Sequence, residues 1–206
     1  MLFCCKSNSK KKDSVLYDDR QTAVRITRIV ETQNNAEAPS WVTEYFFNDL
    51  QTIDRTRDDY VFIAEETSSN LKVLLQWEKN FFVEQDIRQL VFMRVYNRFI
   101  DNIRISPDEQ YGIFFERVLK QTANVFWPDA QQIESFWAIV EYPRDSAQAG
   151  SVNFYKLLIL NTIPKKTVQA ELQSIMNGIQ FAKKERPDKD QMIAINRIKN
   201  NFFDNF

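Results

Sequence analysis

Three pairs of adjacent carboxylates are the side chains whose type and spacing could do chemistry in this sequence. They are Asp18-Asp19, Asp58-Asp59 and Glu65-Glu66. Paired carboxylates can hold Mg²⁺ or Ca²⁺, and they can hydrolyse glycosides. However, neighbours in a strand point to opposite faces, and aspartate is favoured in turns because its side chain bonds the local backbone. We therefore expect solvated surface positions, with a carboxylate-metal enzyme as an alternative.

The rest of the composition removes most other kinds of reaction. The chain of 206 residues has no histidine, two cysteines and three glycines. It therefore lacks the imidazole of nucleophilic triads, a four-ligand zinc site and a Gly-rich phosphate loop. We expect no catalytic residue, no metal, no cofactor and no small-molecule substrate. The net charge of -1 argues against nucleic-acid binding, and no apolar run reaches the roughly 18 residues that a membrane-spanning helix needs.

The two cysteines, Cys4 and Cys5, indicate a lipid tether instead. They follow a short apolar start and precede a polar, lysine-rich stretch. Such a stretch buries too little apolar surface to offset the entropy that it would lose on ordering. This arrangement is typical of the end of a bacterial lipoprotein signal peptide. Cys5 fits the acceptor position because Leu2 lies three residues before it and a small residue directly precedes it. Cys4 fits less well, since the bulky Phe3 precedes it.

The lipoprotein interpretation carries one further expectation and leaves alternatives open. A secretory signal needs a charged start and an apolar stretch of about 7–15 residues, so we expect the true start to lie upstream of Met1. Alternatively, Cys4 and Cys5 are palmitoylated beside the basic cluster at 10–12, on the cytosolic face of a eukaryotic membrane. A third interpretation is a tail without lipid.

The apolar periodicity predicts the elements that would position any site. They are a strand at 22–32, a helix from Ser40, a strand at 60–65, a long helix from Ser69 or Asn70 to about Asn102, a helix that starts at Ser106-Pro107, strands at 132–142 and 151–162 that form a hairpin, a helix that is capped by Thr167 and closes at Gly178, and a helix from Asp188. We expect a kink or break in the long helix between Glu78 and Gln85. Helices grouped beside strands indicate an α+β fold: a small, mostly antiparallel sheet of three to four strands packed against the long helix and further helices.

Several of these segments together resemble one family. They are Pro39-Ser40-Trp41-Val42, the strand at 60–66, the long helix that follows Ser68-Ser69, and the run Phe136-Trp137-Ala138-Ile139-Val140-Glu141-Tyr142-Pro143. In that order they resemble the LPP20-like lipoproteins of the bacterial cell envelope, over about residues 39–179. Members of that family are non-enzymatic, so the resemblance implies no catalytic residue. It implies lipid on Cys5 and an envelope location, on a membrane face that the sequence does not specify.

The sequence divides into three parts. Residues 1–21 form the lipid-attachment site and a flexible basic leash, 22–182 form the α+β domain, and 183–206 form a linker and a C-terminal amphipathic helix. Two groups of residues are candidate contacts for a protein partner: the loop residues Phe126 and Trp127, and the apolar stripe of the last helix, Ile195, Ile198 and Phe202. Such a helix docks in a partner's groove or packs back on its own domain. We therefore expect a structural or protein-interaction module held at a membrane by its lipid.

Overall fold

The chain folds into a four-stranded antiparallel sheet with helices on its faces and beyond one end. The structure is a computed structural model that describes residues 28–47, 58–103, 109–143, 151–204 and 206. Its elements are β1 (Arg28–Thr32), a 3₁₀ turn η1 (Gln33–Asn35), α2 (Ser40–Phe47), β2 (Asp59–Ser68), α4 (Leu71–Asn80), α5 (Val83–Ile103), α6 (Glu109–Thr122), β3 (Gln131–Pro143), β4 (Ser151–Pro164), α7 (Lys165–Gly178), a 3₁₀ turn η2 (Lys183–Glu185) and α8 (Lys189–Asn201). The strand order is β1-β3-β4-β2. The α+β class predicted from the sequence is confirmed.

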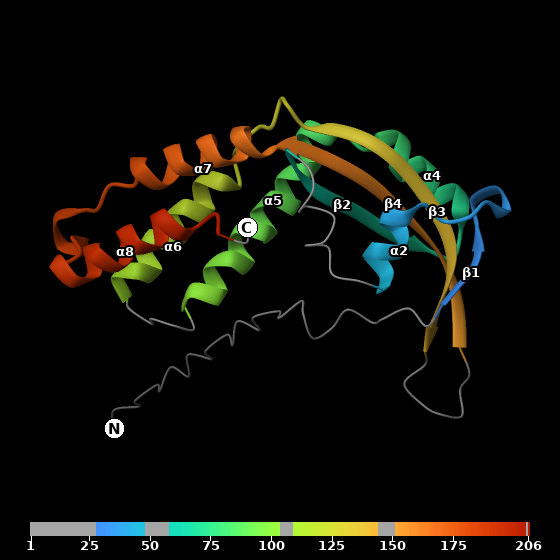
Figure 1. Cartoon of the computed structure of the whole chain (residues 1–206), viewed down its shortest axis with the longest axis horizontal. Helices are drawn as coiled ribbons and strands as arrows, with labels where there is room; N and C mark the ends of the chain where they lie inside the picture. Colours follow the sequence, from blue (N-terminus) through green and yellow to red (C-terminus); the bar gives the residue numbers. More distant parts are fainter. Residues whose placement is uncertain (1–27, 48–57, 104–108, 144–150, 205) are drawn as a thin grey trace, which may run out of the picture.

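Strand β4 lies at the centre of the sheet, and its sequence is apolar on both faces. Leu158 and Leu160 face Trp41 and Val42 of α2, in one buried cluster. Leu157 and Ile159 face Leu74 of α4, in another. A strand covered on both sides has no polar face, so its residues form a continuous apolar run instead of alternating. Figure 1 shows α2 inside the curve of the sheet and α5 to α8 gathered beyond one end of it.

The predicted long helix is interrupted between Asn80 and Val83, within the range where polar residues break the apolar stripe. Its first half begins after Asn70, whose side chain accepts a hydrogen bond from the backbone N–H of Lys72. Its second half begins beside Asp86, whose carboxylate accepts the backbone N–H of Phe82 at 2.6 Å. The expected break between Glu78 and Gln85 is therefore confirmed, and each half has its own polar group at its start.

The C-terminal helix α8 shares its core with α5, α6 and α7. A capping box begins it, because Asp188 accepts the N–H of Gln191 and the Gln191 side chain accepts the N–H of Asp188. Ile195 and Phe202 then lie in the same buried cluster as Phe99 and Phe114 of the preceding helices. The sequence placed residues 183–206 outside the main domain. In the structure the helix belongs to the domain's largest buried cluster.

The expected start of α7 needs correction. The helix begins at Lys165, so Thr167 lies in its first turn, not at its cap. The chain turns at Pro164, and the N–H of Lys165 donates to the carbonyl of Asp58 at 2.9 Å. The Thr167 hydroxyl instead donates to Asp129 at 2.7 Å. The expected end at Gly178 agrees with the structure.

Several expectations lie outside the described residues. They are the part of the first strand at 22–27, the Ser106-Pro107 helix start, the hairpin connection at 144–150 and the whole of the segment that contains Cys4 and Cys5. Among the helices that the structure does describe, none combines the length and the apolar character needed to cross a bilayer.

Candidate functional site

A hollow of about 680 Å³ lies beside the C-terminal end of α6 and the middle of α7. We call it the α6–α7 hollow. The residues that line it are Arg117, Lys120, Gln121, Asn124, Val125, Phe126, Glu171 and Ile175. Helix α6 supplies one wall because its last turns pack against α7, and the loop after it supplies the rim. The lining combines one aromatic ring, two aliphatic side chains and charges of both signs.

Phe126 and Trp127 follow one another at the rim of this hollow, and their burial is opposite. Phe126 is 53% exposed, whereas Trp127 is 1% exposed. The loop between them and α6 is tied to the helix end, where Asn124 donates its side-chain N–H to the carbonyl of Lys120 at 2.8 Å. After them, the N–H of Ala130 donates to the carbonyl of Trp127 at 3.1 Å and closes a turn. The backbone thus holds one aromatic ring in the core and presents the other to solvent.

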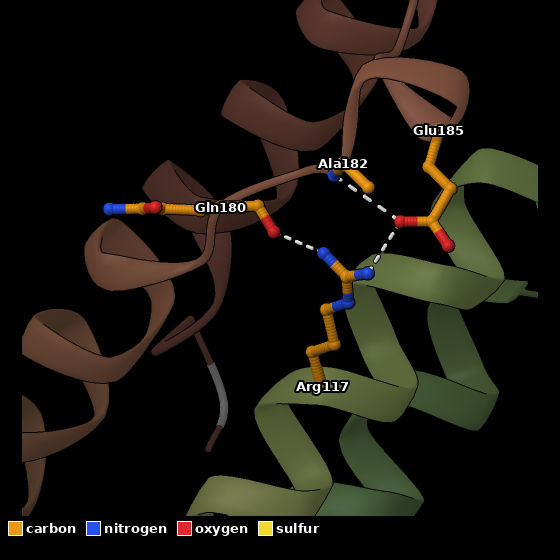
Figure 2. A network of polar contacts seen from close by, with 4 residues as sticks. All are labelled: Arg117, Gln180, Ala182 and Glu185. Atoms are coloured by element: carbon orange, nitrogen blue, oxygen red, sulfur yellow. Dashed lines mark hydrogen bonds and ion pairs between the residues drawn. The ribbon is translucent and has the colours of Figure 1, made fainter.

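Arg117 connects the wall of the hollow to the chain that leaves α7 (Figure 2). Its guanidinium donates to the carbonyl of Gln180 and pairs with the Glu185 carboxylate at 2.5 Å. The same Glu185 oxygen accepts the N–H of Ala182 at 3.3 Å, so one carboxylate holds both the helix and the following turn. The guanidinium also lies 5.8 Å from the ring centre of Phe181. This network fixes the chain beside the hollow.

The five residues expected to contact a partner do not form one surface. Phe126 is exposed, and Ile198 is partly buried against the main core. Trp127, Ile195 and Phe202 are each 1% exposed, so in this structure these three lie in the core and not on the surface. Their burial has a physical reason, because α8 packs back on its own domain and the turn after Trp127 directs the indole inward. Lys120 and Glu171, which the sequence did not single out, line the hollow with Phe126.

The two carboxylate pairs that the structure describes do not line the hollow. Glu65 pairs with Lys156 at 2.7 Å and accepts a hydrogen bond from Tyr45 of α2. Glu66, the next residue of the strand, accepts the N–H of Thr67. Asp58 is exposed, and Asp18-Asp19 lies outside the described residues. Within the part of the chain that the structure describes, no three side chains of the metal-binding types His, Cys, Asp and Glu gather where they could hold an ion.

Among the residues that the structure describes, two titratable groups have pKa values displaced from the ordinary ones. The pKa of Glu141 on β3 is lowered because its carboxylate accepts a hydrogen bond from Ser151 of β4 and also pairs with Arg28 of β1, although its partial burial acts in the opposite direction. The pKa of Lys199 on α8 is lowered because burial disfavours the charged ammonium. Neither group lines the α6–α7 hollow.

No family model, curated protein or solved structure matches this chain.

Proposed function

We propose that this chain is a non-catalytic protein-interaction module that a lipid on Cys5 holds at a membrane of the bacterial cell envelope. The observation that carries the interaction part is Phe126, a large apolar ring that a fixed loop keeps 53% exposed at the rim of the α6–α7 hollow. Aromatic side chains are enriched among the residues that dominate protein interfaces. A partner therefore gains apolar contact at one defined point.

The charges around Phe126 define the kind of partner. Lys120 and Glu171 are exposed and line the same hollow, one on α6 and the other on α7. A peptide segment with an apolar anchor and charges of both signs complements this lining, because each charge then meets its opposite. The hollow lies open beside the helices, which suits a protein segment better than an enclosed small molecule.

The tether rests on the sequence pattern around Cys5 and on the resemblance to LPP20-like lipoproteins. A second candidate is palmitoylation of both Cys4 and Cys5 at a cytosolic membrane face, which the adjacent cysteines and the lysines at 10–12 favour. Two acyl chains, or one chain with a polybasic patch, anchor a protein stably where a single chain is marginal.

Two changes of exposed apolar residues test the interaction. We expect Phe126→Ser to lower co-purification of a partner crosslinked in the native cell by at least about tenfold, which corresponds to about 1.4 kcal/mol. The matched control is Ile193→Ser on α8, where the side chain is 57% exposed and lies outside the hollow. Equal loss for both variants, or no loss for Phe126→Ser, contradicts the proposed contact.

Mass spectrometry of the native protein tests the tether. The lipoprotein form begins at Cys5 and carries acyl chains on that residue. The palmitoylated form retains the residues before Cys5 and loses its acyl groups to hydroxylamine, which cleaves thioesters. Free thiols on both cysteines, together with equal detergent partition of the wild type and Cys5→Ser, reject the membrane tether.

A further inference from the structure

Arg94 on α5 lies within a group of aromatic rings that belong to distant parts of the chain. Its guanidinium carbon is 4.8 Å from the ring centre of Tyr60, 5.3 Å from that of Phe62 and 5.1 Å from that of Phe206. It donates to the carbonyl of Val61 at 3.2 Å and to the backbone oxygen of Phe206 at 2.7 Å. One arginine thus connects strand β2 to the end of the chain.

Arg98, one helical turn further along α5, holds the same segment of chain. It donates to the backbone oxygens of Phe202 and Asn201, each at 2.9 Å. We call Asn201, Phe202, Phe203 and Phe206 the tail. Figure 1 shows the end of the chain beside α5. The two guanidinium groups therefore donate hydrogen bonds to backbone oxygens of the tail. Hydrogen bonds from a charged donor are stronger than those between neutral groups.

The aromatic rings of the tail pack against rings of α5 and β2. Phe202 lies 5.1 Å from Phe99, and Phe206 lies 5.1 Å from Tyr60 in an edge-to-face arrangement. These two tail phenylalanines are 1% and 8% exposed. A protein site for a peptide combines aromatic rings with a few polar groups. The rings provide apolar contact area, and polar groups such as these arginine donors fix the orientation of the peptide.

The tail itself has little structure of its own. Two backbone hydrogen bonds join near neighbours within it: the N–H of Asp204 donates to the carbonyl of Asn201 at 3.1 Å, and the N–H of Phe206 donates to the carbonyl of Phe203 at 3.2 Å. None of its described residues pairs with a strand, and the two arginines and the rings beneath hold it in position. A short turn held in this way makes the contacts that a bound peptide makes.

We infer that Arg94, Arg98 and the rings of Tyr60, Phe62 and Phe99 form a peptide-binding socket that the tail occupies within its own chain. The structure shows what the socket accepts: a turn with two phenylalanines four residues apart, which present their backbone oxygens to the arginines. A partner segment with this Phe-x-x-x-Phe pattern competes with the tail. The socket shares no residue with the α6–α7 hollow, so the inference does not rest on the proposed function.

Binding of the tail peptide from solution tests the socket. The probe is a fluorescent peptide that copies residues 197–206, and the full chain carries Phe202→Ala and Phe206→Ala so that its own tail no longer fills the pockets. The peptide binds only molecules whose own tail has left the socket. The apparent affinity of the chain for the peptide is therefore reduced in proportion to the fraction of such molecules. We expect the doubly substituted chain to bind the peptide at least about tenfold more tightly than the wild type.

Two controls make the result specific to the socket. Adding Arg94→Met to the doubly substituted chain is expected to abolish binding, whereas adding Arg88→Met is not, because Arg88 lies on the same helix and donates to its own helix at Gln85. A peptide that carries alanine at both phenylalanine positions is expected not to bind. Equal binding by the wild type and the doubly substituted chain, or binding that survives Arg94→Met, overturns the inference.

Hydrogen exchange on the wild type provides a test that survives misfolding of the variants. If the tail opens by itself, its amides exchange with a lower opening free energy than the amides of α5, because sub-global opening exposes only the released segment. Exchange of the tail and α5 together, with one common free energy, means that the tail is an inseparable part of the core and overturns the inference.

Discussion

Arg94 and Arg117 each connect a helix to a distant part of the chain, but the side chains that surround the two guanidinium groups differ. Each arginine lies on a helix and donates to a backbone oxygen far along the chain, Arg94 to Phe206 and Arg117 to Gln180. Three aromatic rings lie around the guanidinium of Arg94. Arg117 has one ring nearby, and its side chain and that of its partner Glu185 are 31% and 37% exposed.

This difference decides how much each contact contributes to stability. Water competes for the partners of Arg117, and exposed ion pairs contribute about 0–1 kcal/mol. Arg94 is also half-buried, but three rings lie around its guanidinium and it donates to two backbone oxygens, so its loss removes more contacts. The same pairing of guanidinium and carbonyl therefore holds the tail firmly at Arg94 and fixes a local turn beside the hollow at Arg117.

The largest effect is expected from Phe202→Ala. This side chain is 1% exposed and contacts the rings of Phe99, Phe203 and Phe206. Removing a fully buried phenylalanine ring typically costs about 3–5 kcal/mol, because transfer energy is lost and a cavity remains. Urea unfolding followed by circular dichroism measures this cost. A loss below about 1 kcal/mol would mean that the contacts of the Phe202 ring contribute little to stability.

Arg94→Met is expected to cost about 2–3 kcal/mol in the free energy of unfolding. The methionine keeps apolar contact with the rings but leaves the backbone oxygens of Val61 and Phe206 without this donor, and hydrogen bonds to charged groups contribute about 1.5–3 kcal/mol. Arg88→Met, on the same helix, is the matched control and should cost less than about 0.5 kcal/mol. Equal costs for the two variants would mean that the contacts of Arg94 with β2 and the tail add no more to stability than the contact of Arg88 with its own helix.

Glu185→Gln tests the other side of the comparison. The amide keeps the size of the side chain and removes the charge that pairs with Arg117. We expect a loss of about 0–1 kcal/mol, which shrinks as salt is added because exposed charges are screened. Unfolding at low and high ionic strength measures both. A loss of several kcal/mol that is independent of salt would place Arg117 in the same class as Arg94.

The sheet and the interrupted helix were predictable because their signals are local. The apolar run of β4 and the polar break before Val83 each lie within a few residues. The position of the tail in the socket was not predictable in the same way. Arg94 and Phe206 are 112 positions apart in the sequence, and only the fold brings them together. One signal was present: Arg94 and Arg98 are one turn apart on a helix, beside the buried Val91 and Val95.

Among the expected contact residues, Phe126 and Trp127 show where sequence reasoning stops. Both are aromatic, and they are neighbours in the same loop, so composition assigns them the same role. The turn in which the N–H of Ala130 donates to the carbonyl of Trp127 follows Trp127 and leads directly into β3. The burial of Trp127 therefore depends on where β3 begins. The opposite burial of the two rings is therefore a tertiary property that no residue pattern within the loop encodes.

The smallest expected effect concerns Lys199, which lies on α8 one turn before Phe203 and 5.4 Å from the ring centre of Phe114. Burial lowers the pKa of its ammonium in the folded chain, so the unfolded chain binds more protons in the interval between that lowered pKa and about 10.5. The free energy of unfolding should therefore rise with pH across this interval, because the folded chain already holds the neutral amine. Lys199→Met removes this contribution, so the wild type gains stability relative to the variant as the pH rises toward about 10.5, as measured by urea unfolding at each pH. A constant difference across that range would mean that α8 leaves the ammonium as well solvated as the unfolded chain does.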